Sequence, residues 1–214
     1  MESSVIVDET LAGELRSPYT DQRYGVNIIV RPSVDISEYI CFIQNQLRTQ
    51  EPDQYYYPVE TLHLTLVEIC FSRPQNEAVH IGQTVAAKIK SVLHPVPVFQ
   101  VKEPMLTYDA RACALKFTST SGIGNVRRLI TERLRTESVE IEQRYQSESA
   151  HITFMRYTRP LSQDWTQWLT LLLALSQKKD IVWSIGEAWL TWGATWYGMR
   201  SRIQEFGPCP LTAV

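Results

Sequence analysis

The sequence lacks several features that point to common classes of protein. Its longest apolar run, residues 168–175, is far too short to cross a lipid bilayer. The opening residues, MESSVIVDET, contain neither the basic segment nor the apolar block of a secretion signal. No CxxC pair occurs, so neither a zinc ribbon nor a small disulfide scaffold is indicated. We therefore expect a protein of the cytoplasm that does not associate with a membrane.

An excess of charge is also absent. The chain has 21 Lys and Arg against 23 Asp and Glu, a formal net charge of −2. This balance argues against a broad basic surface that grips long nucleic acid through its phosphates. A small or single-ended anionic ligand still fits, because a few local donors suffice to bind it. The four cysteines are expected to be reduced and mostly buried: Cys41, Cys70, Cys113 and Cys209.

The length and composition indicate one globular unit. A chain of 214 residues can build one full core, and a second complete domain would be a tight fit. With 44% hydrophobic and 21% charged residues, the composition is close to the average of globular proteins. We expect a single domain of two small lobes over residues 1–214, with about residues 1–20 as a flexible N-terminal stretch.

Apolar periodicity predicts a mixed chain whose element order repeats once. Helical spacing occurs in four segments: 35–50, 76–94, 124–138 and 162–179. Strand-like segments are 24–32, 62–69, 98–104, 105–110, 111–119, 150–157, 181–192 and 194–206. Both halves read strand, helix, strand, helix, strands. This order predicts an α+β protein built from two similar lobes.

Two of the four histidines occupy the same local pattern. In LHLTLVEI, alternation along a strand places His63 and Thr65 on one face and the leucines on the other. In AHITFMRY, His151 and Thr153 share a face in the same way. With 18 threonines in 214 positions, roughly 0.3 His-x-Thr matches are expected by chance, before apolar flanks are required. One copy would be weak, but the doubled motif is informative.

The residue types suggest a reason for the pairing. Each histidine could simply occupy the wet face of a half-buried strand, and this interpretation suits one motif better than two. Imidazole titrates near neutral pH, and a threonine hydroxyl both donates and accepts hydrogen bonds. Two such pairs facing one cleft could clamp a phosphoryl group, with one histidine as general base and the other as general acid. Such chemistry requires no metal.

The motifs HLTL and HITF, 88 residues apart, resemble those of the 2H phosphoesterase superfamily. That superfamily includes the bacterial 2′-5′ RNA ligase-like proteins and cyclic nucleotide phosphodiesterases. The resemblance covers roughly residues 24–204 in element order, and in residue identity it rests on the two motifs and a few flanking positions. It implies a two-lobed, pseudo-symmetric α+β fold with an antiparallel sheet in each lobe, helices outside and a central groove.

The resemblance also implies roles for the four motif residues. His63 and His151 match the catalytic histidines of the family, and Thr65 and Thr153 match the hydroxyls that hold the phosphoryl oxygens. The ending of HITFMR is similar to the frequent arginine ending of the second motif, which falls on Arg156. Strand alternation nevertheless predicts that Arg156 points away from the histidine face.

Aromatic side chains could stack on a nucleobase, since such stacking needs little sequence preference. The tyrosine run before the first motif is polar-flanked and the least core-like of these aromatics. Tyr157 has the same parity as His151 and is expected to line the same groove. Packing in the core is the alternative for each of them. The substrate-binding candidates are Tyr55, Tyr56, Tyr57, Tyr157, Trp196, Tyr197 and Arg156.

The hypothesis is hydrolysis of a 2′,3′-cyclic phosphate or of a 2′-5′-linked nucleotide, without cofactor or metal. The low net charge favours a small nucleotide or an RNA end over a long RNA, and we expect a monomer. His80 and His94 have no spacing that would join them to the strand histidines as zinc ligands, so surface positions are expected. Non-catalytic nucleotide binding on the same scaffold and 2′-5′ RNA ligation remain as alternatives.

Overall fold

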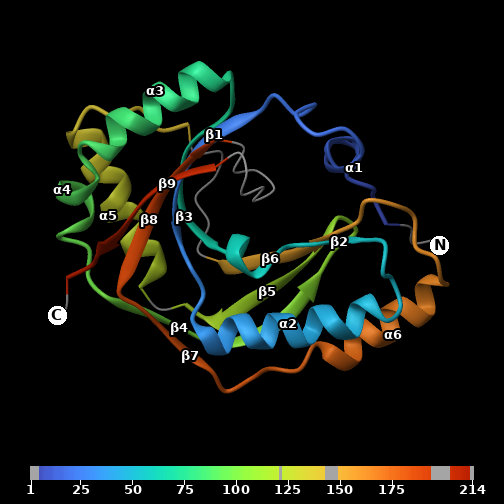
Figure 1. Cartoon of the computed structure of the whole chain (residues 1–214). Coiled ribbons are helices and arrows are strands. Elements are labelled where there is room, and N and C mark those ends of the chain that lie inside the picture. The colour runs from blue at the N-terminus through green and yellow to red at the C-terminus, as the bar shows by residue number, and fades with distance from the viewer. Residues whose placement is uncertain (1–4, 121, 143–148, 194–202, 213–214) are drawn as a thin grey trace.

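The computed structural model describes residues 5–120, 122–142, 149–193 and 203–212. Its named strands form two sheets, and each ladder within them is antiparallel (Figure 1). The four-stranded sheet has the order β3-β1-β8-β9. Its strands are β1 (Tyr24–Val30), β3 (Leu64–Arg73), β8 (Glu187–Gly193) and β9 (Ile203–Pro210).

The second sheet has five strands in the order β2-β6-β5-β4-β7. Its strands are β2 (Tyr55–Tyr56), β4 (Phe99–Tyr108), β5 (Ala112–Ser119), β6 (Ala150–Arg156) and β7 (Val182–Ile185). The first His-x-Thr motif therefore belongs to one sheet and the second to the other. The predicted α+β fold, with two lobes and an antiparallel sheet in each, is confirmed.

The helices cover the sheets and connect the strands. They are α1 (Glu9–Arg16), α2 (Val34–Arg48), the 3-10 turn η1 (Val59–Thr61), α3 (Gln75–Ala86), α4 (Ile89–Leu93), α5 (Ile123–Thr136) and α6 (Trp165–Leu175). Apolar residues at helical spacing explain the two longest helices. Helix α2 buries Ile36, Ile40, Ile43 and Leu47, and α5 buries Ile123, Val126, Ile130 and Leu134. Among the described residues, none of these helices has both the length and the apolar character to cross a membrane.

The crossover helices exchange places between the two repeats. The repeated units are β1-α2-β3-α3 and β5-α5-β6-α6. Helix α2 belongs to the first unit but packs on β6 of the second, and α5 belongs to the second unit but packs on β3 of the first. As a result, α2 lies beside α6 along one side of the molecule, whereas α3, α4 and α5 lie together on the other (Figure 1). One hydrophobic core extends through both sheets and their helices.

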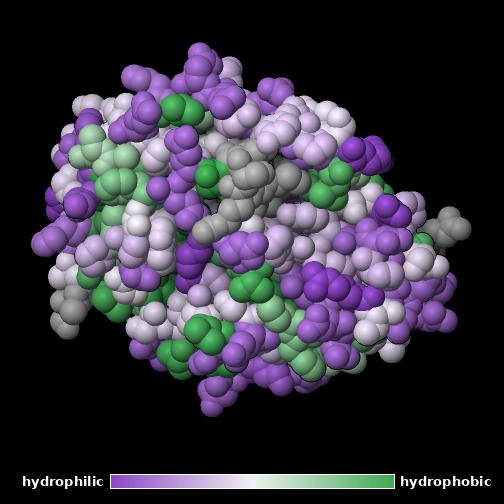
Figure 2. Space-filling model, viewed as in Figure 1, coloured by the Kyte–Doolittle hydropathy of each residue, from purple (hydrophilic) through white to green (hydrophobic). Residues whose placement is uncertain are grey.

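The outer surface carries small apolar groups rather than one broad patch in the view of Figure 2. The large hydrophobic residues that are exposed include Val34 and Phe42 on α2 and Leu173 on α6. Scattered residues of this kind are normal for a globular surface.

Several element boundaries differ from those predicted. The helix predicted over 76–94 is broken between α3 and α4, and the three short strands predicted between 98 and 119 are the two strands β4 and β5. The segment predicted as one strand over 181–192 is β7 and β8, which belong to different sheets and are separated by Gly186. The short elements α1 and β2 were not predicted, because neither has a periodic pattern long enough to detect.

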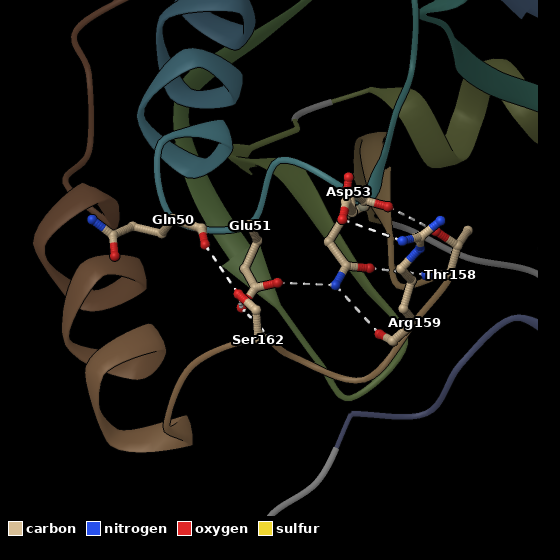
Figure 3. Close-up of polar contacts among 7 residues, drawn as sticks. Gln50, Glu51, Asp53, Thr158, Arg159 and Ser162 are labelled. Atoms are coloured by element: carbon tan, nitrogen blue, oxygen red, sulfur yellow. Dashed lines mark hydrogen bonds and ion pairs between the residues drawn. The ribbon is translucent and has the colours of Figure 1, made fainter.

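A buried carboxylate joins the loop that precedes β2 to the loop that follows β6. Glu51 lies just after α2 and is 2% exposed. Its Oε1 accepts hydrogen bonds from the backbone nitrogen and the hydroxyl of Ser162 at 2.8 and 3.0 Å, and from the backbone nitrogen of Gln163 at 3.3 Å. Its Oε2 accepts from Gln54, whose Oε1 accepts from the backbone of Thr158 (Figure 3). This network holds β2 against the end of β6.

Replacing Glu51 by alanine should destabilise the protein. The substitution removes the buried acceptor of four hydrogen bonds, so we expect a loss of about 2–4 kcal/mol in the free energy of unfolding, measured by urea denaturation. Asp53→Ala is the matched control, since its ion pair with Arg159 joins side chains that are 68% and 62% exposed. The control should change stability by less than about 0.5 kcal/mol. A loss below about 1 kcal/mol for Glu51→Ala would contradict this role.

Candidate active site

His63 lies just after η1 and one residue before β3. Its neighbours Leu62 and Leu64 are fully buried, while His63 itself is partly accessible. The Nδ1 atom lies 2.8 Å from the carbonyl oxygen of Thr61. Because a carbonyl only accepts, Nδ1 carries the hydrogen in this contact, and Nε2 of the neutral ring is an acceptor. His63 can therefore take a proton at Nε2, or donate one from it when the ring is protonated.

His151 and Thr153 share one face of β6. In the ladder with β5, His151 pairs with Lys116 and Thr153 pairs with Ala114. Paired residues project to the same side of a sheet, and Lys116 and Ala114 are two positions apart on a regular strand. His151 is exposed and Thr153 half-buried, whereas Ile152 between them is fully buried. The expected separation of polar and apolar faces holds through this motif.

Each motif strand has a bulge three positions after its histidine, and β3 has two further register shifts toward its C-terminal end. In β3 the bulge residue is Leu66: Ile28 and Ile29 of β1 pair with Val67 and Thr65, so Leu66 falls between two pairs of the ladder. In β6 the bulge residue is Phe154, which falls between the pairs that Cys113 and Ala114 of β5 form with Met155 and Thr153. Such β-bulges place two successive side chains on the same side: Leu66 and Val67 are both buried, as are Phe154 and Met155. Beyond each bulge the alternation of faces is reversed.

The bulge brings Arg156 to the face that carries His151. Arg156 pairs with Ala112 of β5, and Ala112 has the same parity as Ala114, the partner of Thr153. The prediction that Arg156 points away from the histidine is therefore wrong, because simple alternation does not survive the inserted residue. The guanidinium is half-buried.

Tyr157 is displaced in the opposite direction, into the core. Its side chain is fully buried, and its hydroxyl accepts a hydrogen bond from Nε1 of Trp168 at 2.9 Å. Sγ of Cys113 lies 3.8 Å from the same hydroxyl. The prediction that Tyr157 lines the histidine face is wrong for the same reason, and its ring packs in the core.

The tyrosine run lies in β2 and just after it. Tyr56 and Tyr57 are buried, which corrects the prediction that this run is the least core-like of the aromatic candidates. The hydroxyl of Tyr57 accepts a hydrogen bond from Nε of Arg156 at 3.1 Å. Tyr55 is partly accessible and pairs with Arg156 across the β2–β6 ladder, so it lies on the face of His151. Of the run, only Tyr55 keeps partial access to solvent.

The surroundings of His63 disfavour its charged form. Desolvation is the main cause that lowers the pKa of His63. The positive charges of Arg31 and His151 lower this pKa further, while the Thr61 carbonyl and Glu205 raise it. The strand that follows His63, β3, packs against β6, which carries His151. The two strands that carry the doubled motif therefore lie against each other.

His151 is surrounded by cationic groups. Desolvation again comes first among the causes that lower its pKa, even though solvent reaches part of the ring. Arg127, Lys116 and Arg156 lower the pKa further, each by its positive charge. Both histidines thus favour the neutral form more than an isolated imidazole does. Three cationic side chains act on His151.

Sequence reasoning missed several residues near the histidines. Arg31, which follows β1, donates from Nη1 to the carbonyl of Leu62 at 3.1 Å and forms an ion pair with Glu205 of β9. Lys116 of β5 and Arg127 of α5 were not singled out either. These residues come from distant segments, and no local pattern connects them to the motifs. The candidates Trp196 and Tyr197 lie outside the described residues.

The remaining histidines and the cysteines have no part in this arrangement. His80 and His94 are exposed, as predicted. Cys70, Cys113 and Cys209 are buried and unpaired with one another, also as predicted. Within the described segments, no group of three or more His, Cys, Asp or Glu side chains is arranged to hold a metal ion.

Comparison by sequence and by structure gives different outcomes. No family model matches the sequence. No curated protein matches it either. Among solved structures, TT0787 of Thermus thermophilus is 14% identical with a TM-score of 0.60, and the match covers 85% of this chain and 93% of that one.

Two other structures match over a similar extent. A phosphoesterase is 14% identical, with a TM-score of 0.52 and coverage of 88% of this chain and 95% of that chain. E. coli LigT complexed with 3′-AMP is 13% identical, with a TM-score of 0.50 and coverage of 90% and 96%. At these identities the likeness concerns the fold. These structures are members of the 2H phosphoesterase superfamily, and the two-lobed fold implied by the motifs is therefore confirmed as the fold of this chain.

Proposed function

We propose that this protein is a phosphodiesterase of the 2H type, which hydrolyses a 2′,3′-cyclic phosphate or a 2′-5′-linked nucleotide by two-histidine acid–base catalysis. The observation that supports the proposal is the packing of β3, which directly follows His63, against β6, which carries His151, so that the two motif strands come together from different sheets. Each brings a threonine two residues further along its strand. Neither sheet alone contains both proton carriers.

The reaction needs one proton acceptor and one proton donor. A neutral imidazole removes a proton from water as the water oxygen attacks phosphorus. The bond from phosphorus to the ribose oxygen breaks, and the second, protonated imidazole gives its proton to that oxygen. Each positioned proton transfer contributes about 10²- to 10⁴-fold to the rate. Which histidine takes which role depends on how the substrate lies, because Nε2 of His63 serves either role.

The threonines complete the scheme at the non-bridging oxygens. Thr65 and Thr153 are half-buried, so their hydroxyls keep some access to a bound ligand. Hydrogen bonds from these hydroxyls strengthen as negative charge develops in the transition state. Arg156 and Lys116, which lie on the same face as His151, add positive charge toward a phosphoryl group.

The local chemistry supports a small nucleotide as the substrate. Tyr55 offers a partly accessible ring on the same face as His151, where it can stack on a base. LigT, which shares the fold, has been solved in complex with 3′-AMP. The positive groups at His151 are few and local, as suits one or two phosphates rather than a long backbone.

Alanine substitution of either histidine should abolish turnover. We expect His63→Ala and His151→Ala to lower kcat by at least about 10²-fold, because each removes one of the two proton transfers. The measurement is mass analysis of products from a panel of 2′,3′-cyclic mononucleotides, 2′-5′ oligoadenylates and cyclic dinucleotides, with chelator present. His80→Ala, an exposed histidine on α3, is the matched control.

The same panel separates the proposal from its alternatives. Turnover by the wild type that chelator does not change supports the proposal. Near-full activity in either histidine variant would contradict the proposal. Ligand-induced thermal stabilisation without turnover would indicate a nucleotide-binding protein, and joined 2′-5′ products would indicate ligation.

The rate should peak at mildly acidic pH. The active form needs one neutral and one protonated histidine, so kcat/KM is highest between their two pKa values. Both pKa values lie below the usual value of about 6.5, and the maximum of kcat/KM is therefore expected below about pH 6.5. A bound phosphodiester anion raises both pKa values, so the kcat profile should lie at higher pH. Rates measured from about pH 4.5 to 9 test this, and a kcat/KM maximum in the alkaline range would contradict it.

Tyr55 and Tyr157 should respond differently to substitution. Tyr55→Ala is expected to raise KM several-fold, since stacking on a base is worth about 1–3 kcal/mol. Tyr157→Phe should leave KM unchanged and lower stability by about 1–2 kcal/mol, because the Trp168 N–H loses its buried acceptor. Steady-state kinetics and denaturant unfolding of both variants check the assignment. A raised KM only in Tyr157→Phe would reverse it.

A further inference from the structure

A single guanidinium joins the two motif strands. Arg127 of α5 donates from Nη2 to the carbonyl of Thr65 at 2.8 Å and from Nε to the carbonyl of Leu66 at 3.1 Å. From Nη1 it donates to the carbonyl of Ser149, at 2.9 Å. Thr65 and Leu66 belong to β3, and Ser149 is two residues before His151. All three nitrogen atoms of the guanidinium are thus used, on β3 of one sheet and on the residue that precedes β6 of the other.

The position of these carbonyls explains why a side chain must bind them. β3 is the edge strand of the four-stranded sheet. β2 pairs only with Met155 and Arg156 of β6, so among the described strands the first half of β6 has a neighbour on one side only. Carbonyl groups that point outward from such edges have no ladder partner and need another donor. Arg127 supplies donors to both edges at once.

The second motif has a counterpart of this contact. Gln44 is 2% exposed on α2, and its Nε2 donates to the carbonyls of Phe154 and Tyr57, each at 2.9 Å. Phe154 is the bulge residue of β6, as Leu66 is the bulge residue of β3. In both repeats, therefore, a polar side chain from the exchanged crossover helix holds the carbonyl of the bulge residue. The arrangement recurs with the pseudo-symmetry of the fold, while the residue types differ.

We propose that Arg127 and Gln44 are positioning residues, which hold the two bulged motif strands at the separation that the two-histidine reaction requires. This inference rests on the proposed function. Neither side chain needs to touch the substrate, because each acts through the backbone of a motif strand. A misplacement of about 1 Å between reacting groups can cost on the order of 10²-fold in rate.

Arginine is suited to bind three backbone carbonyl groups at once, as it does at position 127. Its planar, rigid fork presents several N–H groups in fixed directions, whereas lysine has one compact ammonium on a flexible stem. Lysine at this position keeps the charge and loses the three-way bridge. Methionine keeps much of the apolar length and loses both the charge and the three-way bridge. The pair of variants therefore separates geometry from charge.

The charge gives a second, independent readout at His151. The charged groups that lower its pKa are Arg127 from α5, Lys116 from β5 and Arg156 from β6. Removing the positive charge of Arg127 removes one cause that lowers the pKa of His151, so this pKa should rise. One limb of the pH–rate profile should then move to higher pH while the other stays: the acidic limb if His151 is the base, and the alkaline limb if it is the acid.

The experiment compares Arg127→Lys and Arg127→Met with matched substitutions at the next position. Arg128 is exposed and pairs with Glu132 on the same helix, so Arg128→Lys and Arg128→Met are the controls. We expect both Arg127 variants to lose about 10- to 100-fold in kcat with KM changed less than about threefold. Only Arg127→Met should shift a pH limb. Both Arg128 variants should stay within about twofold of the wild type.

The outcomes decide the inference separately from the proposed function. Wild-type activity in Arg127→Lys, or equal losses in the Arg127 and Arg128 variants, would overturn it. If the Arg127 variants do not fold, Gln44→Met decides: a fall in kcat at constant KM supports the inference, and full activity overturns it. If the wild type turns over no substrate, the proposed function fails, and amide hydrogen exchange tests the strand positioning. Faster exchange in β3 and β6 of Arg127→Lys, but not of Arg128→Lys, would support it; unchanged exchange would overturn it.

Discussion

The inserted residue Phe154 in the second motif strand determines which side chains share the face of His151. Without this bulge, strict alternation would turn Arg156 away from His151 and bring Tyr157 toward it. With it, a cation lies on the histidine face and an aromatic ring fills the core. The bulges also break the regular backbone ladder, so their carbonyls lie where a side chain can bind them. The chemistry of the site therefore depends on a local defect that the surrounding structure holds in place.

The exchange of crossover helices is what makes that support available. If α2 and α5 each covered their own sheet, the two lobes would meet only along the edges of β3 and β6. Because each helix packs on the other sheet, its buried apolar side is shared between the lobes, and its polar residue at the seam reaches the opposite bulge. Hydrophobic packing thus fixes the lobes as one body, and hydrogen bonds define the finer spacing of the motif strands.

The sequence predicted the parts of this arrangement that depend on short-range patterns. Helix and strand periodicity located the repeated units, and the doubled His-x-Thr pattern located His63 and His151. Alternation was reliable as far as Thr65 and Thr153. It failed one residue later, because no glycine or proline marks either bulge and the inserted residues are ordinary apolar ones. Arg127 and Gln44 could not be predicted for a different reason. The carbonyl groups that each side chain binds belong to segments distant in sequence, so no local pattern connects them.

Net charge describes this site poorly. The whole chain carries −2, yet the groups that act on His151 are three cations, while His63 lies near the oppositely charged Arg31 and Glu205. Charges farther away than the Debye length of about 8 Å are screened, so the acidic residues elsewhere on the surface contribute little here. A phosphodiester anion placed between the histidines would gain most from the His151 side, where its charge offsets mutual repulsion among the cations. The asymmetry gives the two pseudo-symmetric motifs different electrostatic surroundings, and hence a physical basis for different roles in the reaction.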